Sequence, residues 1–449
     1  MQLLLSKIAE ILACEQPEKD AMVTGTVIDS RKVVMGNLFI ALQGEHVDGH
    51  HYLATARLAG ATAALVTEKQ DDELTQLVVK DVVKAFGMIA KYWRQQCNAK
   101  LVAVTGSNGK TTVKEMLASV LRLSGNVIAT EGNLNNELGV PLTLSRLENE
   151  TDFAVIEMGA NHAGEIARLV AMAMPNVSII NNVAAAHLEG FSSIDGVAKA
   201  KAEIFSGLVE SGTAVINTDM KYADEWKQVL TNHKIISFAI ENEADITAID
   251  IQNGPHSSHF MVEIESEFHA INLPLPGLHN VANALATIAI TRALDIPVAV
   301  IVKGLAAMKS VPHRLELRRG RQGAQLIDDS YNANPGSYQQ ALSVLQASNG
   351  EHWLVLGDFG ELGSESESLH YKMGLDAKES GVNRLWTVGT ESRAATQAYG
   401  NGAKHFEHIA DLQKQLEKTL SSDVTCLIKG SRFMQLDKLA DKLANRGED

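Results

Sequence analysis

Short runs of apolar residues, many of them β-branched, recur along the chain between longer amphipathic stretches. In the middle of the chain they cover Leu101–Thr105, Asp152–Met158, Val177–Ile180 and Gly212–Ile216. Continuous apolar runs without alternation are typical of parallel strands that helices cover on both faces. The pattern therefore predicts an α/β fold in which βαβ units build a mostly parallel, doubly wound sheet.

Residues 246–273 follow a different pattern. Phe260, Val262 and Ile264 alternate with polar residues, as expected of strands with one solvated face. We expect this segment to add antiparallel strands to the central sheet.

The length of 449 residues exceeds what one hydrophobic core supports and suggests about three domains. Residues 1–82 are expected to form a small α/β domain. Residues 83–311 begin with a helix near Val82–Gln96 and contain the parallel sheet. Residues 312–449 start a new βα series after Pro312 and are expected to be Rossmann-like. The strands expected in the outer domains are Val23–Ile28, Leu38–Ala41, Ala63–Val66, Ala324–Ile327, Trp353–Leu356, Arg384–Val388 and Thr425–Ile428.

Composition narrows the class of protein. The net charge of −14 argues against a nucleic-acid partner. Cys14, Cys97 and Cys426 are odd in number and far apart, which fits neither a disulfide framework nor a metal site and is expected in a reducing cytosol. No window approaches the roughly 18 uncharged apolar residues of a membrane span. Leu4, Ile8 and Leu12 instead indicate an amphipathic first helix and no export signal.

A glycine-rich turn, Gly106-Ser-Asn-Gly-Lys-Thr-Thr112, follows the first central strand and opens a helix. Backbone amides of such a turn bind phosphate oxygens, a lysine neutralises the β/γ charge, and a hydroxyl can hold Mg²⁺. The common phosphate loop carries a glycine five residues before Gly109, where this chain has Val104. The alternative is an ordinary βα turn with a solvated Lys110.

Two polar residues follow the next buried strands. Glu157 ends one strand, and His187 comes after Val177–Ile180. Ligands of open parallel sheets bind at the carboxyl ends of the strands, so a carboxylate there can hold Mg²⁺ directly or through water. Glu157 can instead be a solvated residue at a turn. An isolated histidine is more often structural than a ligand, and the position of His187 beside the expected metal makes the two roles about even.

Lys201 falls on the apolar side of an expected helix, which Ser192 and Asp195 would begin as a capping box. The apolar stripe of this helix comprises Ile194, Val197, Ile204, Phe205 and Leu208. At 100° per residue Lys201 lies within the stripe and Lys199 on the opposite face. A buried amine resists protonation and can pair with a carboxylate or react with CO₂ to form a metal-binding carbamate. The alternative, which the pattern alone favours, is a buried stem whose ammonium reaches water.

The third domain repeats one arrangement at three strand ends. A strand runs into a polar turn at Leu326–Pro335, at Leu356–Gly363 and at Ile428–Arg432. The arrangement suggests a shared ligand face. Lys429 and Arg432 could meet an anionic group there, or could be solvated charges at a strand end.

Several longer motifs accompany the phosphate loop in a fixed order. They are Glu131–Pro141, Glu157–Asn161, Ala186–Gly190, Gly277–Asn283, His313–Glu316 and Asp328–Pro335. Together they resemble the ATP-dependent Mur ligases of peptidoglycan synthesis over essentially the whole chain. Within that family, Glu131–Pro141 and Ser330–Pro335 are most similar to the members that add D-alanyl-D-alanine.

The resemblance implies the residues that bind ATP and Mg²⁺. The phosphates would contact Gly106, Ser107, Asn108, Gly109, Lys110, Thr111 and Thr112, and the nucleoside would contact Asn280, Arg314 and Asp329. Thr111 would hold one Mg²⁺. Glu157, His187 and Lys201, the last as a carbamate, would hold a second. Lys110, His187 and Lys201 would be the catalytic residues.

The resemblance also implies two small-molecule substrates. The nucleotide-sugar site would comprise Ser30, Arg31, Asp48 and His50, with Asn135 and Asn136 beside the sugar or the peptide stem. Lys429 and Ser431 would contact the incoming dipeptide. The implied activity is ligation of D-alanyl-D-alanine to UDP-N-acetylmuramoyl-tripeptide through an acyl phosphate. The implied protein is a cytoplasmic bacterial monomer.

Two other functions compete with this one. Another Mur ligase or a folylpolyglutamate-type synthetase would share the short phosphate loop and the ligase chemistry. A folylpolyglutamate-type synthetase is not expected to carry Asp29-Ser-Arg31 or Asn133-Leu-Asn-Asn136. An ATP-driven switch or binding module would form no covalent product.

Overall fold

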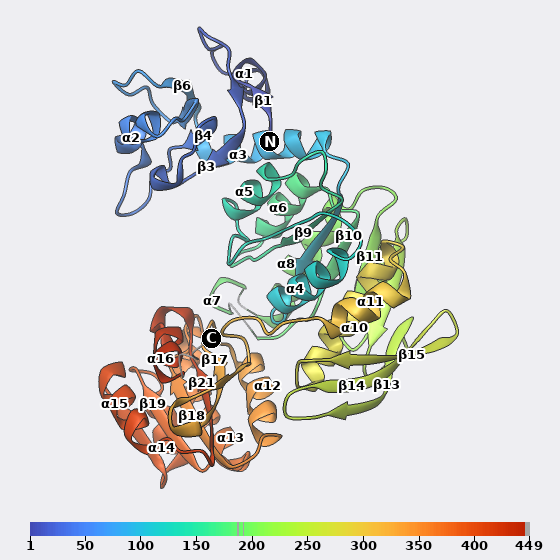
Figure 1. Ribbon diagram of the computed structural model, residues 1–449, viewed down its shortest axis with the longest axis vertical. Coiled ribbons are helices and arrows are strands. Elements are labelled where there is room, and N and C mark those ends of the chain that lie inside the picture. The colour runs from blue at the N-terminus through green and yellow to red at the C-terminus, as the bar shows by residue number, and fades with distance from the viewer. Residues whose placement is uncertain (186–187, 192, 445–449) are drawn as a thin grey trace.

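The structure is a computed structural model that describes residues 1–185, 188–191 and 193–444. Three bodies follow one another along its long axis, with the N-terminal unit at one end, the third domain at the other and the central domain between them (Figure 1). Over the described ranges the strands form four sheets. No helix in these ranges is long and apolar enough to cross a membrane.

The N-terminal unit is a small α/β body. Strands β1 (Leu3–Leu4) and β2 (Met22–Val23) pair antiparallel around helix α1 (Leu5–Leu12). A parallel sheet follows in chain order, with β3 (Gly25–Val27), β4 (Asn37–Ile40), β5 (Ala63–Val66) and β6 (Thr75–Val78). Short helical turns η1 (Ser30–Lys32) and η2 (Gly49–Tyr52) and helix α2 (Leu53–Leu58) connect these strands. The three expected strands are present, and β6 is an addition to them.

Helix α3 (Val82–Gln96) joins this unit to the central domain. It begins after Asp81, whose carboxylate accepts a hydrogen bond from the Lys84 amide. It packs against α1 and against the central helices α5 (Gly139–Ser145) and α6 (Glu165–Ala173). The Trp93 indole donates to the Leu147 carbonyl at 2.9 Å. One apolar core therefore continues from the first unit into the second.

The central sheet has the strand order β15-β14-β13-β12-β11-β10-β7-β9-β8. Its parallel strands are β7 (Lys100–Thr105), β8 (Val127–Ala129), β9 (Phe153–Glu157), β10 (Val177–Ile180), β11 (Thr213–Asn217), β12 (Lys234–Ala239) and β13 (Ile246–Asn253). Strands β14 (Ser258–Ile264) and β15 (Glu267–Leu273) extend it antiparallel. The expected mostly parallel sheet with an antiparallel addition is confirmed.

Helices cover both faces of this sheet. Helices α4 (Lys110–Leu121), α10 (Leu278–Ala293) and α11 (Val298–Ala306) form one core with it, and α3, α5 and α6 form the other. The second core also contains residues of α8 (Ile194–Ala202), η3 (Glu203–Gly207) and α9 (Ala223–Val229). Helix α7 (Leu188–Phe191) is a single short turn.

The third domain is a Rossmann-like unit, as expected. Its strand order is β16 (Glu316–Arg319), β17 (Gln325–Asp329), β21 (Val424–Lys429), β18 (Glu351–Gly357), β19 (Arg384–Val388) and β20 (Ala403–Phe406). Only β16 runs antiparallel among these described strands. Helices α12 (Pro335–Gln346), α13 (Ser366–Glu379) and α14 (Arg393–Tyr399) pack on one face, and α15 (Ile409–Thr419) and α16 (Leu436–Leu443) on the other. Short turns η4 (Arg321–Gly323), η5 (Gly363–Glu365) and η6 (Arg432–Met434) complete it.

Candidate functional site

Neighbouring strands of the central sheet bring polar residues to one edge. Because β10, β7 and β9 are adjacent and parallel, their carboxyl ends lie together. The phosphate loop follows β7, Glu157 ends β9, and Asn181 and Asn182 follow β10. This is the edge at which open α/β sheets bind ligands.

The phosphate loop is a tight turn that requires glycine. Gly109 has a φ of +76°, and a Cβ atom there would lie 2.5 Å from Asn283 Oδ1 and 2.6 Å from Asn181 Nδ2. The amides of Ser107 and Asn108 donate to the backbone carbonyl and side-chain oxygen of Asn182, at 2.9 and 2.8 Å. No side chain of the described residues caps α4, so its first amides are available to phosphate oxygens.

Three asparagine side chains form a series of hydrogen bonds that ends at the backbone of the phosphate loop. Asn181 donates to the Asn108 carbonyl at 3.1 Å and to Asn283 Oδ1 at 2.8 Å. Asn283 in turn donates to Asn280 Oδ1, and Asn280 donates to the Pro276 carbonyl. Sequence reasoning missed Asn181 and Asn283, although Asn181 stands directly after an apolar strand. Asn280 belongs to this support, and its contact with a nucleoside stays a prediction.

Lys110 begins α4 and folds back over the loop. Its Nζ donates to the Gly106 carbonyl at 2.7 Å, and the residue is partly buried. Burial lowers its pKa, the nearby Glu157 carboxylate opposes that shift, and Arg314 adds to it. The charge of Lys110 thus lies next to the turn that would receive phosphate and is influenced by a carboxylate and by a second cation.

Glu157 is buried, and neighbouring groups hold it at both carboxylate oxygens. Thr111 Oγ1 donates to Oε2 at 2.9 Å, and Asn135 Nδ2 donates to Oε1 at 2.8 Å. A hydroxyl and a carboxylate are hard oxygen ligands of the kind Mg²⁺ prefers, and here they lie beside the phosphate loop. The residues present therefore fit a magnesium ion. Asn135, which was assigned to the acceptor substrate, holds the carboxylate in this arrangement.

Lys201 is buried on α8, with 2% of its surface exposed, whereas Lys199 is exposed. Burial and the charge of Lys110 lower the pKa of Lys201 well below its ordinary value. No hydrogen bond or ion pair to Lys201 Nζ occurs among the described residues. The inward orientation inferred from periodicity is confirmed, and an exposure of 2% disagrees with a side chain that extends its ammonium into solvent.

The start of α8 differs from the expectation. Ser193 is the N-cap, and its Oγ accepts from the Gly196 amide at 3.0 Å. The expected cap Ser192 and the predicted ligand His187 lie outside the described residues. Ile194 is 42% exposed although it was placed on the apolar stripe, because the first turn of the helix lies at the surface.

The nucleotide-sugar candidates lie at the carboxyl edge of the N-terminal sheet. Arg31 is exposed and pairs with Asp29 through Nε and Nη2, at 2.9 and 2.8 Å, which lowers the pKa of Asp29 to about 2. His50 is buried, and its Nε2 accepts from the Thr67 amide at 3.0 Å. His50 Nδ1 therefore carries the proton and donates to Asp48 at 2.6 Å.

The other acceptor-side candidates differ in exposure. Ser30 opens the same turn as Arg31 and is half-buried. Asn136 is exposed, and its Oδ1 accepts from the amides of Leu138 and Gly139 at the start of α5. Contacts of these residues with a substrate stay predictions.

In the third domain two predicted site residues pair with each other. Lys429 Nζ donates to Asp329 Oδ2 at 2.5 Å, and both residues are buried. Asp329 Oδ1 also accepts from the Leu315 amide at 3.2 Å, which fixes the turn that carries Arg314. Ser431 is buried and accepts from the Gly360 amide. Lys429 thus turns toward a carboxylate in the domain interior.

Three Mur ligase family models match consecutive parts of the chain. The catalytic-domain model of the family matches residues 22–121, the Mur ligase middle domain matches residues 104–291, and the Mur ligase glutamate ligase domain matches residues 313–432. A UDP-N-acetylmuramoyl-tripeptide–D-alanyl-D-alanine ligase of Escherichia coli K12 is 43% identical over 446 residues, which cover 99% of this chain and 98% of that protein. The chain belongs to the Mur ligase family.

Solved structures carry the same likeness through all three domains of this Mur ligase. A MurF crystal structure from Acinetobacter baumannii superposes with a TM-score of 0.91 at 34% identity and covers 99% of both chains. A MurF ligase from Thermotoga maritima in complex with ADP has a TM-score of 0.82 at 26% identity, over 94% of this chain and 97% of that one.

The third domain of this Mur ligase touches the phosphate loop. Asn334, the N-cap of α12, donates from Nδ2 to Asn108 Oδ1 at 2.7 Å. A Cβ atom on Gly336 would lie 3.2 Å from Ala184 Cβ and from Asn108 Nδ2. Arg314 stacks over the Tyr331 ring at 4.2 Å. Residues of two domains therefore meet at the expected ATP site.

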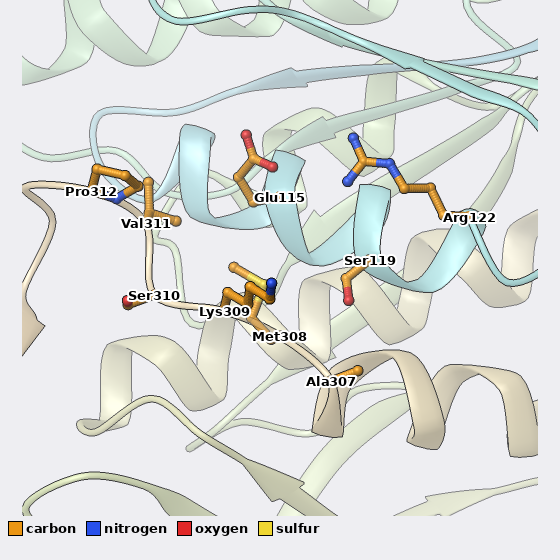
Figure 2. A pocket seen from close by; sticks show the side chains of 9 residues that line it. All are labelled: Glu115, Ser119, Arg122, Ala307, Met308, Lys309, Ser310, Val311 and Pro312. Carbon is orange, nitrogen blue, oxygen red and sulfur yellow. The ribbon is translucent and has the colours of Figure 1, made fainter. Parts of the chain in front are cut away.

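A cavity of about 450 Å³ lies between α4 and the segment that leads into the third domain (Figure 2). Glu115, Ser119 and Arg122 line it from the helix, and residues 307–312 line it from the connecting segment. Arg314 comes two residues after Pro312, and its amide donates to the Val311 carbonyl. The cavity thus lies next to the turn of Arg314.

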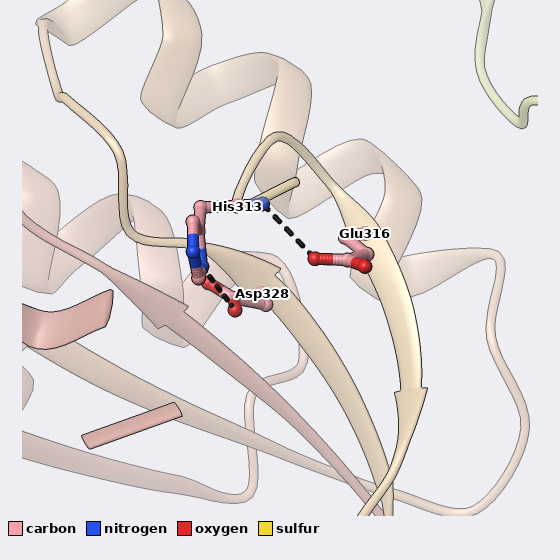
Figure 3. A group of neighbouring side chains, drawn as sticks. All are labelled: His313, Glu316 and Asp328. Atoms are coloured by element: carbon pink, nitrogen blue, oxygen red, sulfur yellow. Dashed lines mark hydrogen bonds and ion pairs between the residues drawn. The ribbon is translucent and has the colours of Figure 1, made fainter. Parts of the chain in front are cut away.

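A cluster of potential metal ligands occurs where the chain enters the third domain (Figure 3). Among the described residues, His313, Glu316 and Asp328 place ligand atoms close enough to share a metal ion. Asp328 Oδ2, however, already receives His313 Nδ1 and Arg318 Nη1, each at 2.9 Å. Asp328 Oδ1 accepts from the Ser330 hydroxyl at 2.5 Å. These bonds explain the cluster as a structural support for the strand that precedes Asp329.

Proposed function

We propose that the protein joins the amino group of D-alanyl-D-alanine to the free carboxylate of UDP-N-acetylmuramoyl-tripeptide, converting ATP to ADP and phosphate. The observation that carries the proposal is Glu157, a buried carboxylate that Thr111 and Asn135 hold beside a preorganised phosphate loop. The Escherichia coli relative that bears this activity in its name matches the chain from end to end, which supports the same substrates here.

The first step transfers the γ-phosphoryl group. An acceptor carboxylate oxygen attacks the γ-phosphorus, the bond to the β-phosphate oxygen breaks, and ADP leaves. Two anions must approach each other, so Lys110 and the first amides of α4 would offset the repulsion and the charge that develops in transfer.

The second step forms the peptide bond. The dipeptide nitrogen attacks the carbonyl carbon of the acyl phosphate to give a tetrahedral intermediate. The bridging C–O bond then breaks, phosphate leaves with that oxygen, and the nitrogen loses a proton. Acyl phosphates hydrolyse readily, so water must be kept out while the amine binds. The contact of Asn334 with Asn108 supports a covering role for the third domain.

We assign Thr111 to one magnesium ion, and Glu157, His187 and Lys201 to a second. Bound Mg²⁺ would neutralise phosphate charge and orient the transferred group. Lys201 suits this role as a carbamate: its neutral amine adds to CO₂, releases a proton and becomes an anion. The burial of Lys201 and the absence of a described partner support this assignment.

Charge and available space suggest where the UDP-linked substrate and the nucleoside of ATP bind. Arg31 is an exposed cation suited to the diphosphate of the UDP-linked substrate, with Ser30, Asp48 and His50 shaping the turns around it. The cavity beside α4 and the turn of Arg314 offer room for the nucleoside of ATP. The requirement for ATP and the three free thiols favour action in the cytoplasm.

Mass spectrometry of the products tests the proposal. The protein is incubated with ATP, D-alanyl-D-alanine and UDP-N-acetylmuramoyl-tripeptide that carries either diaminopimelate or lysine at its third position. We expect the pentapeptide mass with at least one tripeptide, and phosphate release only when both substrates are present. Phosphate released from ATP alone, without a covalent product, would favour the switch.

A further inference from the structure

Lys114 is a charged side chain inside the central domain, one helical turn after Lys110. It is 2% exposed, its Nζ donates to the Thr130 carbonyl at 2.7 Å, and Glu115 lies 2.8 Å away. Lysine is almost never fully buried unless it is paired. Leu117, Ala118 and Leu121, which lie three, four and seven residues further along the helix, are fully buried, so apolar side chains fill this side of α4. Packing alone therefore does not account for a lysine at this position.

Thr130, whose carbonyl accepts the hydrogen bond from Lys114, also bonds to the neighbouring strand. Thr130 is 2% exposed and uses three groups: its amide donates to Val155, its carbonyl accepts from Lys114, and its Oγ1 accepts from the Glu157 amide at 2.9 Å. It thereby connects α4, which begins at the phosphate loop, to the end of β9. It also begins the segment that leads to Asn135.

We infer that Lys114 and Thr130 are positioning residues for the metal ligand Glu157. Thr130 fixes the backbone of Glu157, while Asn135 and Thr111 fix its two carboxylate oxygens. Lys114 ties this assembly to the helix of the phosphate loop, so the carboxylate and the Thr111 hydroxyl face each other before a metal arrives. The inference rests on the proposed metal role of Glu157.

Metal affinity, measured without turnover, tests the inference. Binding of Mn²⁺, used in place of Mg²⁺, is followed by electron paramagnetic resonance in the presence of ADP. Thr130→Val keeps the volume but removes the hydroxyl, and we expect about tenfold weaker Mn²⁺ binding, as is usual when a residue that supports a ligand is lost. Thr130→Ser restores the hydroxyl and should restore the affinity. Lys114→Met should weaken binding in the same direction and provides a second variant if Thr130→Val does not fold.

Thr151→Val is the matched control, because Thr151 Oγ1 also accepts a backbone amide bond, from Glu148 at 3.0 Å, in the same domain. It should lower the melting temperature without changing Mn²⁺ affinity. Equal Mn²⁺ affinity in Thr130→Val and Thr130→Ser, or an equal loss in Thr151→Val, would overturn the inference. Glu157→Gln distinguishes failure of the inference from failure of the proposed metal site. If this variant binds Mn²⁺ as the parent does, the proposed metal role of Glu157 is wrong.

Discussion

Lys429 and Asp329 lie opposite each other on the adjacent parallel strands β21 and β17, and their side chains form a buried ion pair. The family resemblance implies a nucleoside contact for Asp329 and a dipeptide contact for Lys429, yet in the structure the two side chains pair with each other. Asp329 also holds the Leu315 amide, so the pair fixes the turn that presents Arg314 to the phosphate loop. The pair therefore links the core of the third domain to the ATP site.

Lys429→Met tests this link. Removing one partner leaves the Asp329 carboxylate buried and unpaired, which typically costs roughly 3–5 kcal/mol of unfolding free energy. We expect a loss of that order in urea denaturation of the purified protein and a raised KM for ATP, because the turn of Arg314 loosens. A selective rise in the KM for D-alanyl-D-alanine at unchanged stability would instead return Lys429 to the dipeptide site.

Arg31→Ala should raise the KM for the UDP-linked substrate and leave the KM for ATP unchanged. Arg31 is an exposed cation in the first domain, and its guanidinium is oriented by Asp29. Lys32→Ala, which removes the adjacent exposed charge, is the control and should resemble the parent. Steady-state kinetics with each substrate varied in turn measures the effect. Equal increases for both substrates would show that Arg31 supports the fold rather than the diphosphate.

His279 predicts a specific pH dependence of stability. Burial lowers its pKa to about 4, with Asp329 opposing the shift and Lys429 adding to it, and its Nε2 has no partner among the described residues. Between pH 6.5 and 4 the unfolded chain binds a proton that the folded chain does not. The free energy of unfolding should therefore fall by up to about 3 kcal/mol as the pH drops through this window.

His279→Gln should remove that part of the dependence. Urea denaturation of the parent and the variant at pH 7, 6, 5 and 4 measures it, and the difference between the two proteins isolates His279 from other groups. Identical pH slopes in the two proteins would show that His279 does not titrate in this way.

Lys201→Ala should lose most activity, since the amine that would form the carbamate is gone. Formate or acetate should restore part of it by occupying the vacated ligand position. Lys199→Ala is the control, because that side chain is exposed on the same helix. Phosphate release with and without added acid is the measurement. Full activity of Lys201→Ala, or no rescue by either acid, would count against the carbamate.

The main architecture and part of the site could be predicted because both depend on local pattern. Apolar runs mark buried parallel strands, and side chains at their carboxyl ends, such as Glu157, are readable from the sequence. Helical periodicity is also a local pattern, and it correctly predicted that Lys201 is buried. These predictions need no knowledge of which strands are neighbours.

The supporting residues could not be predicted because they depend on strand order. Asn181 reaches the loop only because β10 lies next to β7, and Thr130 reaches Glu157 only because β8 lies next to β9. The bonds of His50 to Asp48 and Thr67 likewise depend on the fold, while the nucleotide-sugar contact that the family resemblance implies for His50 stays a prediction.

Transfer of oxygen from the acceptor carboxylate to phosphate tests the central claim most directly. The account requires the carboxylate of UDP-N-acetylmuramoyl-tripeptide to become an acyl phosphate, whose bridging oxygen leaves with the phosphate. With that carboxylate labelled with ¹⁸O, mass spectrometry should find one ¹⁸O atom in the released phosphate, and only when D-alanyl-D-alanine is also present. Phosphate without the label would contradict the account, because the γ-phosphoryl group would then have passed to water.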